Sequence, residues 1–90
     1  MKVKVTKQFE RDLKKIKRKH FDMEKFQIAI TAITKQDNNK LKQLKAHKLS
    51  GNLKEYYELH IQSDWLLLYK VENHNLILIL TRIEVQNGFC

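Results

Sequence analysis

Two histidines and one aspartate are the residues of this 90-residue sequence that could carry out acid–base chemistry. His60 lies in a segment in which apolar and polar residues alternate, and Asp64 follows four residues later. His47 lies in a lysine-rich segment that could fold over the same surface. An imidazole has an ordinary pKa of about 6.5, so it can take or give a proton near neutral pH. Two imidazoles beside a cationic surface could cleave RNA without a metal. One would take the proton of the attacking 2′-hydroxyl, and the other would protonate the departing 5′-oxygen.

Each of these residues also has a purely structural interpretation. An exposed histidine on a strand is most often an ordinary surface residue, and Asp64 before Trp65 could simply shape a turn. Trp65 and Phe89 could stack on RNA bases, or Trp65 could belong to the hydrophobic core with Phe89 packed onto it. The spacing of the residues leaves both interpretations open.

Other kinds of chemistry find no support in the sequence. Gly51 and Gly88 are the only glycines, so there is no glycine-rich loop to bind phosphate. No Cys-x-x-Cys or His-Glu-x-x-His spacing indicates zinc, and Ser50 and Ser63 lack the context of a nucleophilic serine. We therefore expect neither a metal nor a cofactor.

The composition predicts one basic domain over residues 1–90. The sequence has 18 Lys and Arg against 10 Asp and Glu, a net charge of +8, which favours a polyanionic partner such as nucleic acid. The alternative is an ordinary solvated basic surface. The one cysteine, Cys90, excludes an intrachain disulfide and fits a reducing, cytoplasmic location. The longest apolar runs, Trp65–Tyr69 and Leu76–Leu80, are too short to span a membrane, and no apolar stretch follows the basic N-terminus as in a signal peptide.

The first third of the sequence predicts a strand and two helices. Lys2–Val5 alternates as a half-buried strand would, and Thr6 is a suitable N-cap for a helix over Lys7–His20. Asp22 is a second N-cap, and the following helix has an apolar stripe formed by Phe26, Ala29, Ile30 and Ile33. The short break between the helices predicts an antiparallel helical hairpin.

The remainder predicts a long loop and three strands. Gln36–Lys54 is rich in lysine and lacks periodicity, so we expect a functional or partly helical loop. Alternation over residues 57–62, and the apolar segments Trp65–Val71 and Leu76–Thr81, predict an antiparallel meander. The fold class is therefore α+β, in the order β-α-α-β-β-β, with the helical hairpin packed on a small antiparallel sheet.

A motif around the two histidines resembles a known family. Ala46-His47-Lys48 precedes the Leu-Ser-Gly of residues 49–51, and residues 60–69 read His-Ile-Gln-Ser-Asp-Trp-Leu-Leu-Leu-Tyr. Together with Phe-Glu-Arg-Asp-Leu-Lys-Lys at Phe9–Lys15, these segments resemble the YafQ branch of the RelE superfamily, toxins of bacterial type II toxin–antitoxin systems. The resemblance extends over nearly the whole chain.

The resemblance implies a function and roles for particular residues. Such toxins are small mRNA endonucleases that act in the ribosomal A site, are silenced by a co-expressed antitoxin, and meet operator DNA only through the antitoxin complex. It implies acid–base roles for His47, His60 and Asp64, with Asp64 orienting or tuning an imidazole. Trp65 would support the site or contact RNA. The remaining RNA contacts would come from Lys45, Lys48, Arg82 and Phe89.

The C-terminal residues depart from the family pattern. The family usually ends Arg-Thr-Gly-Thr/Ser-His-x-x-Leu-Phe, and alignment on Arg82 places Gln86 at the catalytic histidine. Tyr57 also stands where many relatives have arginine. Glutamine can hydrogen-bond a phosphate oxygen but cannot exchange a proton near pH 7. Losing a general acid or base costs about 10²–10⁴-fold in rate.

Three hypotheses follow from the sequence. The first is a ribosome-dependent mRNA interferase in which Gln86 contacts phosphate. The second is a catalytically weakened homologue that binds antitoxin and co-represses its operator. The third, a DNA-binding domain, is the poorest because no helix-turn-helix pattern is present.

Overall fold

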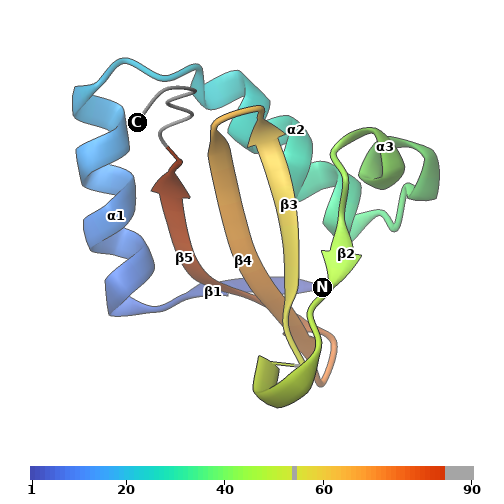
Figure 1. The fold of residues 1–90 in the computed structure, drawn as a ribbon. Helices are drawn as coiled ribbons and strands as arrows, with labels where there is room; N and C mark the ends of the chain where they lie inside the picture. Colours follow the sequence, from blue (N-terminus) through green and yellow to red (C-terminus); the bar gives the residue numbers. More distant parts are fainter. Residues whose placement is uncertain (54, 85–90) are drawn as a thin grey trace.

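The computed structural model describes residues 1–53 and 55–84, an α+β fold whose helices lie against one sheet (Figure 1). The chain begins with strand β1 (Lys2–Val5) and helices α1 (Lys7–Arg18), α2 (Met23–Thr34) and α3 (Asn38–Gln43). It continues with β2 (His47–Lys48), the 3₁₀ turn η1 (Gly51–Leu53), β3 (Tyr57–Gln62), β4 (Trp65–Glu72) and β5 (Asn75–Ile83). Within the described ranges, no helix has the length and apolar character needed to cross a membrane.

The sheet contains the predicted meander and two strands at its edges. Its order is β1-β5-β4-β3-β2, with β3, β4 and β5 antiparallel, as predicted. Asn73 and His74 both have positive φ and form the two-residue turn between β4 and β5. β1 pairs in parallel with β5, a long-range contact that joins the two ends of the described chain and that local pattern did not predict.

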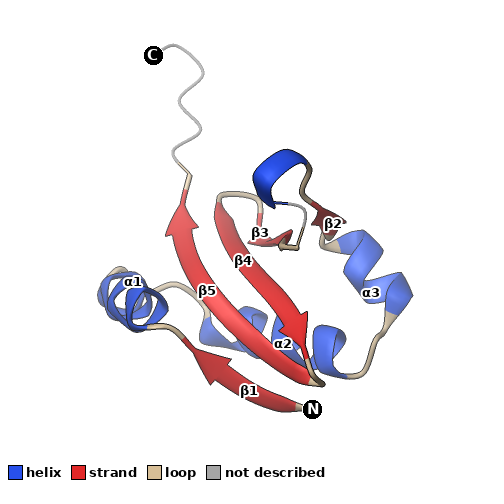
Figure 2. Ribbon diagram, turned by 90° about the horizontal axis from the view of Figure 1, so that it is seen from below, coloured by secondary structure: helices blue, strands red, loops and turns tan. Residues whose placement is uncertain are grey.

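Both long helices lie on the same side of the sheet, α1 along β5 and α2 across it (Figure 2). Their predicted N-caps are confirmed. The hydroxyl of Thr6 accepts a hydrogen bond from the backbone N–H of Phe9 at 3.0 Å, and the carboxylate of Asp22 accepts one from Glu24 at 2.9 Å. α1 ends at Arg18, two residues before the predicted end, and His20 adopts a φ of +60°, which a right-handed helix cannot contain.

The hydrophobic core fills the space between the helices and the sheet. Trp65 is fully buried there, with ring centroids 5.5 Å from Phe21 and 6.2 Å from Phe26. Its indole N–H donates to the hydroxyl of Thr81 at 2.7 Å, so its polar group is satisfied within the core. Phe9 stacks on Phe26 at 5.9 Å and links the two helices.

Beyond the end of β1, two side chains of the α1 region hydrogen-bond the backbone edge of β5. The hydroxyl of Thr6 donates to the carbonyl of Ile79, and the carboxylate of Asp12 accepts from the N–H of Thr81 at 3.2 Å. These backbone groups lie beside a register shift between β4 and β5. Side chains thus satisfy polar groups that a longer β1 would otherwise have paired.

The segment Gln36–Lys54, predicted as a functional or partly helical loop, is partly helical, since it contains α3 and η1. It also contains β2, so it extends the sheet at the edge of β3 and does not fold over the open face. Asp37 caps α3, accepting from Lys40 at 3.1 Å. His47 then pairs with Glu58, and the N–H of His60 donates to the carbonyl of Leu44 at 2.8 Å. The backbone of β3 needs partners along its outer edge, and this segment supplies them.

Candidate active site on the open face of the sheet

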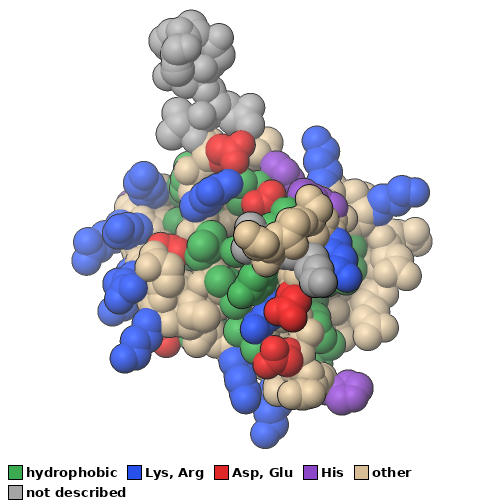
Figure 3. Space-filling model, turned by 60° about the horizontal axis from the view of Figure 1, so that its bottom comes forward, with side chains coloured by type: hydrophobic (Ala, Val, Ile, Leu, Met, Phe, Trp, Pro, Cys, Tyr) green, Lys and Arg blue, Asp and Glu red, His purple; other side chains and the backbone are tan. Residues whose placement is uncertain are grey.

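The strands place one row of side chains on the face that the long helices leave uncovered, here called the open face. Leu59 and Ile61 are buried on the helix side, so Glu58 and His60 point the other way, as predicted. His60 pairs with Leu66, and Leu66 pairs with Arg82 on the next strand. With the bottom of the molecule brought forward, Lys and Arg side chains stand out around the rim (Figure 3). Acidic side chains and some of the histidines lie nearer hydrophobic side chains, and another histidine stands at the rim.

Glu58 links His47 to Arg82 on this face. Nε2 of His47 lies 3.8 Å from one carboxylate oxygen of Glu58, and Nη2 of Arg82 lies 4.0 Å from the other. The same Arg82 nitrogen lies 3.6 Å from Glu84. Nδ1 of His47 is 2.9 Å from the carbonyl of Lys45, which orients the ring. Our sequence reasoning did not include Glu58, although the two-residue period places it on the same face as His60.

His60 is positioned by the turn that follows it. Its Nδ1 lies 3.4 Å from the carbonyl oxygen of Ser63. With a proton on Nδ1, this contact leaves Nε2 free to accept a proton from a substrate. The N–H of His60 is held by Leu44, so the backbone on both sides of the imidazole is fixed.

Asp64 shapes that turn and does not contact an imidazole directly. Its carboxylate accepts a hydrogen bond from the side chain of Gln62 at 3.0 Å, and its carbonyl accepts from the N–H of Glu84 at 2.7 Å. Among the residues that the structure describes, no hydrogen bond or ion pair joins Asp64 to a histidine. Asp64 can therefore orient His60 only through this turn, and the carboxylate beside His47 belongs to Glu58.

The expected contact of Trp65 with RNA is also corrected, because the indole is fully buried against Phe21 and Phe26 and can reach no ligand at the surface. Its other expected role, packing beneath the site, fits this position. Tyr57, which the family resemblance places where many relatives would have arginine, stacks on Tyr69 on the helix side, with ring centroids 5.6 Å apart. Burial, with a smaller effect of the neighbouring Tyr57, raises the pKa of Tyr69 to about 12.

The other expected RNA contacts fall into two groups. Lys45 and Lys48 are exposed on either side of His47, and Arg82 is more than half exposed beside Glu58. Gln86 and Phe89 lie outside the described residues. Within residues 1–53 and 55–84, no group of three or more His, Cys, Asp or Glu side chains could hold a metal ion.

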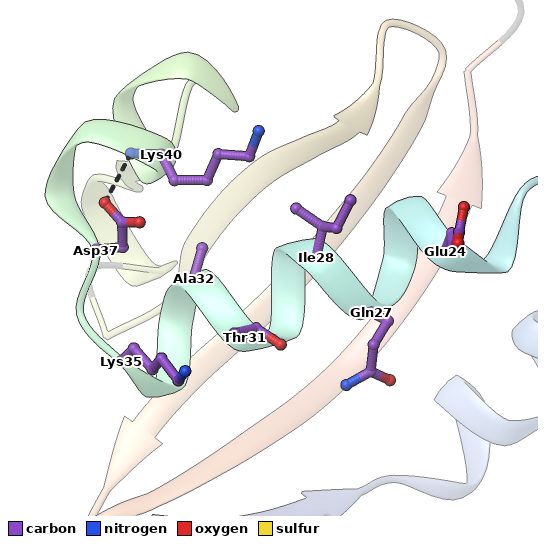
Figure 4. A pocket seen from close by; sticks show the side chains of 8 residues that line it. All are labelled: Glu24, Gln27, Ile28, Thr31, Ala32, Lys35, Asp37 and Lys40. Carbon is purple, nitrogen blue, oxygen red and sulfur yellow. Dashed lines mark hydrogen bonds between the residues drawn. The ribbon is translucent and has the colours of Figure 1, made fainter.

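Two hollows differ in their relation to the histidines. A pocket of about 410 Å³, here called the His60 pocket, is lined by residues 43–45 and 60–63. A groove of about 460 Å³ lies between α2 and α3, with Glu24 near one end and Lys35 near the other (Figure 4). None of the histidines lines this groove, so the chemistry belongs with the His60 pocket and the open face.

Comparison with known proteins finds relatives of this chain. A family model described as "Bacterial toxin of type II toxin-antitoxin system, YafQ" matches residues 1–85. The mRNA interferase toxin YafQ of Escherichia coli K12 is 31% identical over 64 residues, which cover 71% of this chain and 70% of that protein.

Solved structures share the fold over most of the chain. A copper-bound mutant toxin from Helicobacter pylori superposes with a TM-score of 0.81 at 28% identity, covering 92% of this chain and 93% of that one. YafQ in the E. coli DinJ–YafQ complex superposes with a TM-score of 0.74 at 30% identity, covering 90% of each chain.

Proposed function

This chain belongs to the YafQ family of bacterial toxins from type II toxin–antitoxin systems, and on that premise we propose that it is an endoribonuclease that cleaves mRNA on the ribosome. The observation that carries the proposal is that two imidazoles, His47 on β2 and His60 on β3, share the open face with Arg82 of β5, which Glu58 links to His47. Its E. coli relative is named an mRNA interferase toxin.

The two imidazoles have the chemistry for cleavage through the 2′-hydroxyl. One imidazole takes the 2′-hydroxyl proton while the 2′-oxygen bonds to the adjacent phosphorus. The bond from phosphorus to the 5′-oxygen breaks, and the other imidazole, protonated, gives its proton to that oxygen. The products are a 2′,3′-cyclic phosphate and a 5′-hydroxyl.

Nearby cations and carboxylates would support these steps. Arg82 stabilises the added negative charge on the phosphate, and Glu58 orients both Arg82 and His47 until substrate displaces it. Asp64 acts as a positioning residue, because it fixes the turn whose Ser63 carbonyl contacts His60. We assign Gln86 and Phe89 to phosphate and base contacts from the family resemblance.

The charge of the chain suits a ribosomal substrate. A net charge of +8 and the exposed Lys45 and Lys48 beside His47 provide a cationic surface for mRNA and ribosomal RNA. Binding in the A site would present mRNA to the open face. The salt dependence of binding should therefore be steep.

We also propose a co-encoded antitoxin as the protein partner, since a relative was crystallised as the DinJ–YafQ toxin–antitoxin complex. The antitoxin would block the open face and carry the toxin to operator DNA. The pair would act in the cytoplasm.

Primer extension on a defined mRNA in a reconstituted translation system tests the proposal. Cuts inside codons that appear only with ribosomes are the expected result. Folded, antitoxin-free protein that leaves the mRNA intact under these conditions would contradict it.

Gln86 favours a second candidate function, a weakened toxin that acts through antitoxin binding and operator co-repression. This hypothesis predicts that Gln86→His raises cleavage by about 10²–10⁴-fold, because it restores a group that can exchange a proton. If the substitution changes the cleavage rate by less than about threefold, the first proposal stands and the weakened-toxin proposal fails.

A further inference from the structure

The His60 pocket lies beside the candidate active site, and His60 is the one residue of its lining to which a proton transfer is assigned. One wall comes from the end of α3 and the residues after it, 43–45, and the other from the end of β3 and the following turn, 60–63. His60 lines the pocket, so anything bound there lies against an imidazole.

One backbone hydrogen bond joins the two walls: the N–H of His60 donates to the carbonyl of Leu44 at 2.8 Å. The wall formed by residues 43–45 is braced within itself, because the N–H of Ala46 donates to the carbonyl of Leu41 at 2.9 Å. The two bonds hold the walls in place in the free protein. A ligand would therefore enter a site that is already formed, with little ordering cost.

The lining has the composition that a flat heteroaromatic ring requires. Leu44 supplies aliphatic surface, while Gln43 and Ser63 supply hydrogen-bonding groups and Lys45 supplies a positive charge. The volume of about 410 Å³ is within the usual range of small-molecule sites. Sequence-specific proteins recognise unstacked RNA bases by stacking them on aromatic rings, histidine included, and by hydrogen bonds to the base edges. In this pocket His60 supplies the ring and Gln43 and Ser63 supply the polar groups.

We propose that the His60 pocket binds the nucleobase next to the cleaved phosphate and that the amide of Gln43 reads the edge of that base. The substrate class rests on the proposed function, since it is the RNA of that reaction. A base bound in the pocket would position the ribose and phosphate of the same nucleotide beside His60. The pocket is thus a specificity site attached to the catalytic face.

Gln43 is available for this role. Gln43 is the last residue of α3, and its side chain is exposed. Among the described residues, the side-chain oxygen Oε1 accepts one hydrogen bond, a long one of 3.4 Å from Nζ of Lys40. A carboxamide offers a donor and an acceptor side by side, which matches the edge of a base.

Lys45 allows a test that does not weaken the fold. It has a φ of +57°, a conformation that glycine adopts without strain. Lys45→Gly therefore removes the side chain from the pocket while its backbone keeps a favourable conformation. The thermal unfolding midpoint of Lys45→Gly should match that of the wild type, so that a loss of nucleotide binding reports the missing side chain.

Binding is measured by titrating ¹⁵N-labelled protein with each of the four nucleoside 3′-monophosphates and, as a phosphate control, with ribose 5-phosphate. We expect the amide signals of Leu44, Lys45 and Ser63 to shift, with dissociation constants that differ at least about fivefold among the bases. Lys45→Gly should weaken all four nucleotides. Equal shifts with ribose 5-phosphate, or shifts confined to residues outside the pocket, would overturn the proposal.

The base-reading residue is tested with Gln43→Ala and the matched control Gln27→Ala, whose side chain lines the distant α2–α3 groove. Gln43→Ala should reduce a preference of about 5- to 150-fold among the bases to within about twofold, while Gln27→Ala leaves the preference intact. An unchanged preference in Gln43→Ala would show that this residue does not read the base. If the wild-type protein cleaves no RNA, the proposed function fails, but this titration still decides whether the pocket binds a base.

Discussion

The two faces of the sheet use neighbouring residues of the same strands for different purposes. On the covered face, Leu59 and Trp65 are fully buried against the helices. On the open face, Glu58 and His60 remain accessible and carry the groups that can move protons or bind phosphate. Because successive side chains alternate between faces, a change of one residue along β3 separates stability from activity.

His60→Ala should show the largest effect on activity. It removes a proton carrier, so mRNA cleavage should fall by about 10²–10⁴-fold. The thermal unfolding midpoint should change little because the side chain is not part of the core. Retained cleavage by the folded variant would remove His60 from the mechanism.

Trp65→Ala should show the largest effect on stability. Replacing a fully buried aromatic leaves a cavity next to Phe21 and Phe26 and an unpaired Thr81 hydroxyl, at a cost of about 3–5 kcal/mol. Urea denaturation measures this loss. A stable variant with impaired RNA binding would instead show that Trp65 serves the open face.

Glu58→Gln should reduce cleavage by about 10- to 100-fold, because it weakens the links that orient His47 and Arg82. The free energy of unfolding should change by at most about 1 kcal/mol, because these ion pairs are partly exposed. Glu72→Gln, which removes a surface pair with Lys70, is the matched control. Equal activity of both variants in single-turnover cleavage would exclude a role for Glu58.

Tyr69 gives the covered face its own dependence on pH. Its pKa is raised to about 12 in the folded protein, whereas an unfolded tyrosine ionises near pH 10. Between these values the unfolded chain loses a proton that the folded chain keeps, so stability is fully present below pH 10 and falls as pH rises. Tyr69 should account for a loss of about 1–2 kcal/mol across this window.

Urea unfolding at several pH values checks this effect against Tyr69→Phe, which cannot ionise. Above pH 10 the free energy of unfolding of the wild-type protein should fall relative to that of Tyr69→Phe. A constant difference from pH 9 to 12 would contradict the account.

Thr6→Ala should show the smallest of these effects. It removes an N-cap from α1 and a hydrogen bond to Ile79, which costs about 1 kcal/mol. Thr6→Ser keeps the hydroxyl and should recover most of the loss in thermal unfolding. If serine restores nothing, the methyl group rather than the cap is responsible.

Local sequence signals predicted much of the covered face. Thr6 and Asp22 identify helix starts through a single side chain each, and the period of two over residues 57–62 fixes which side of β3 is buried. The pairing of β1 with β5 was not predictable in this way, since it depends on contacts across more than 70 residues of sequence. α3 and β2 are too short to produce a clear period.

The open face was predicted less completely. The orientation of His60 follows from alternation, and Glu58 could have been found by the same rule. The contact between Asp64 and Gln62 depends on how the turn closes, which spacing does not specify. The His60 pocket forms only when the segment after α3 binds the edge of β3, so it is a property of tertiary structure.

In the proposed function, the open face cleaves RNA through the ribose 2′-hydroxyl. The most direct test uses an mRNA with a single 2′-deoxyribose at the mapped cleavage site, in the presence of ribosomes. We expect no cut at that position and 2′,3′-cyclic phosphate ends on the unmodified mRNA. Continued cutting at the deoxy position would contradict it.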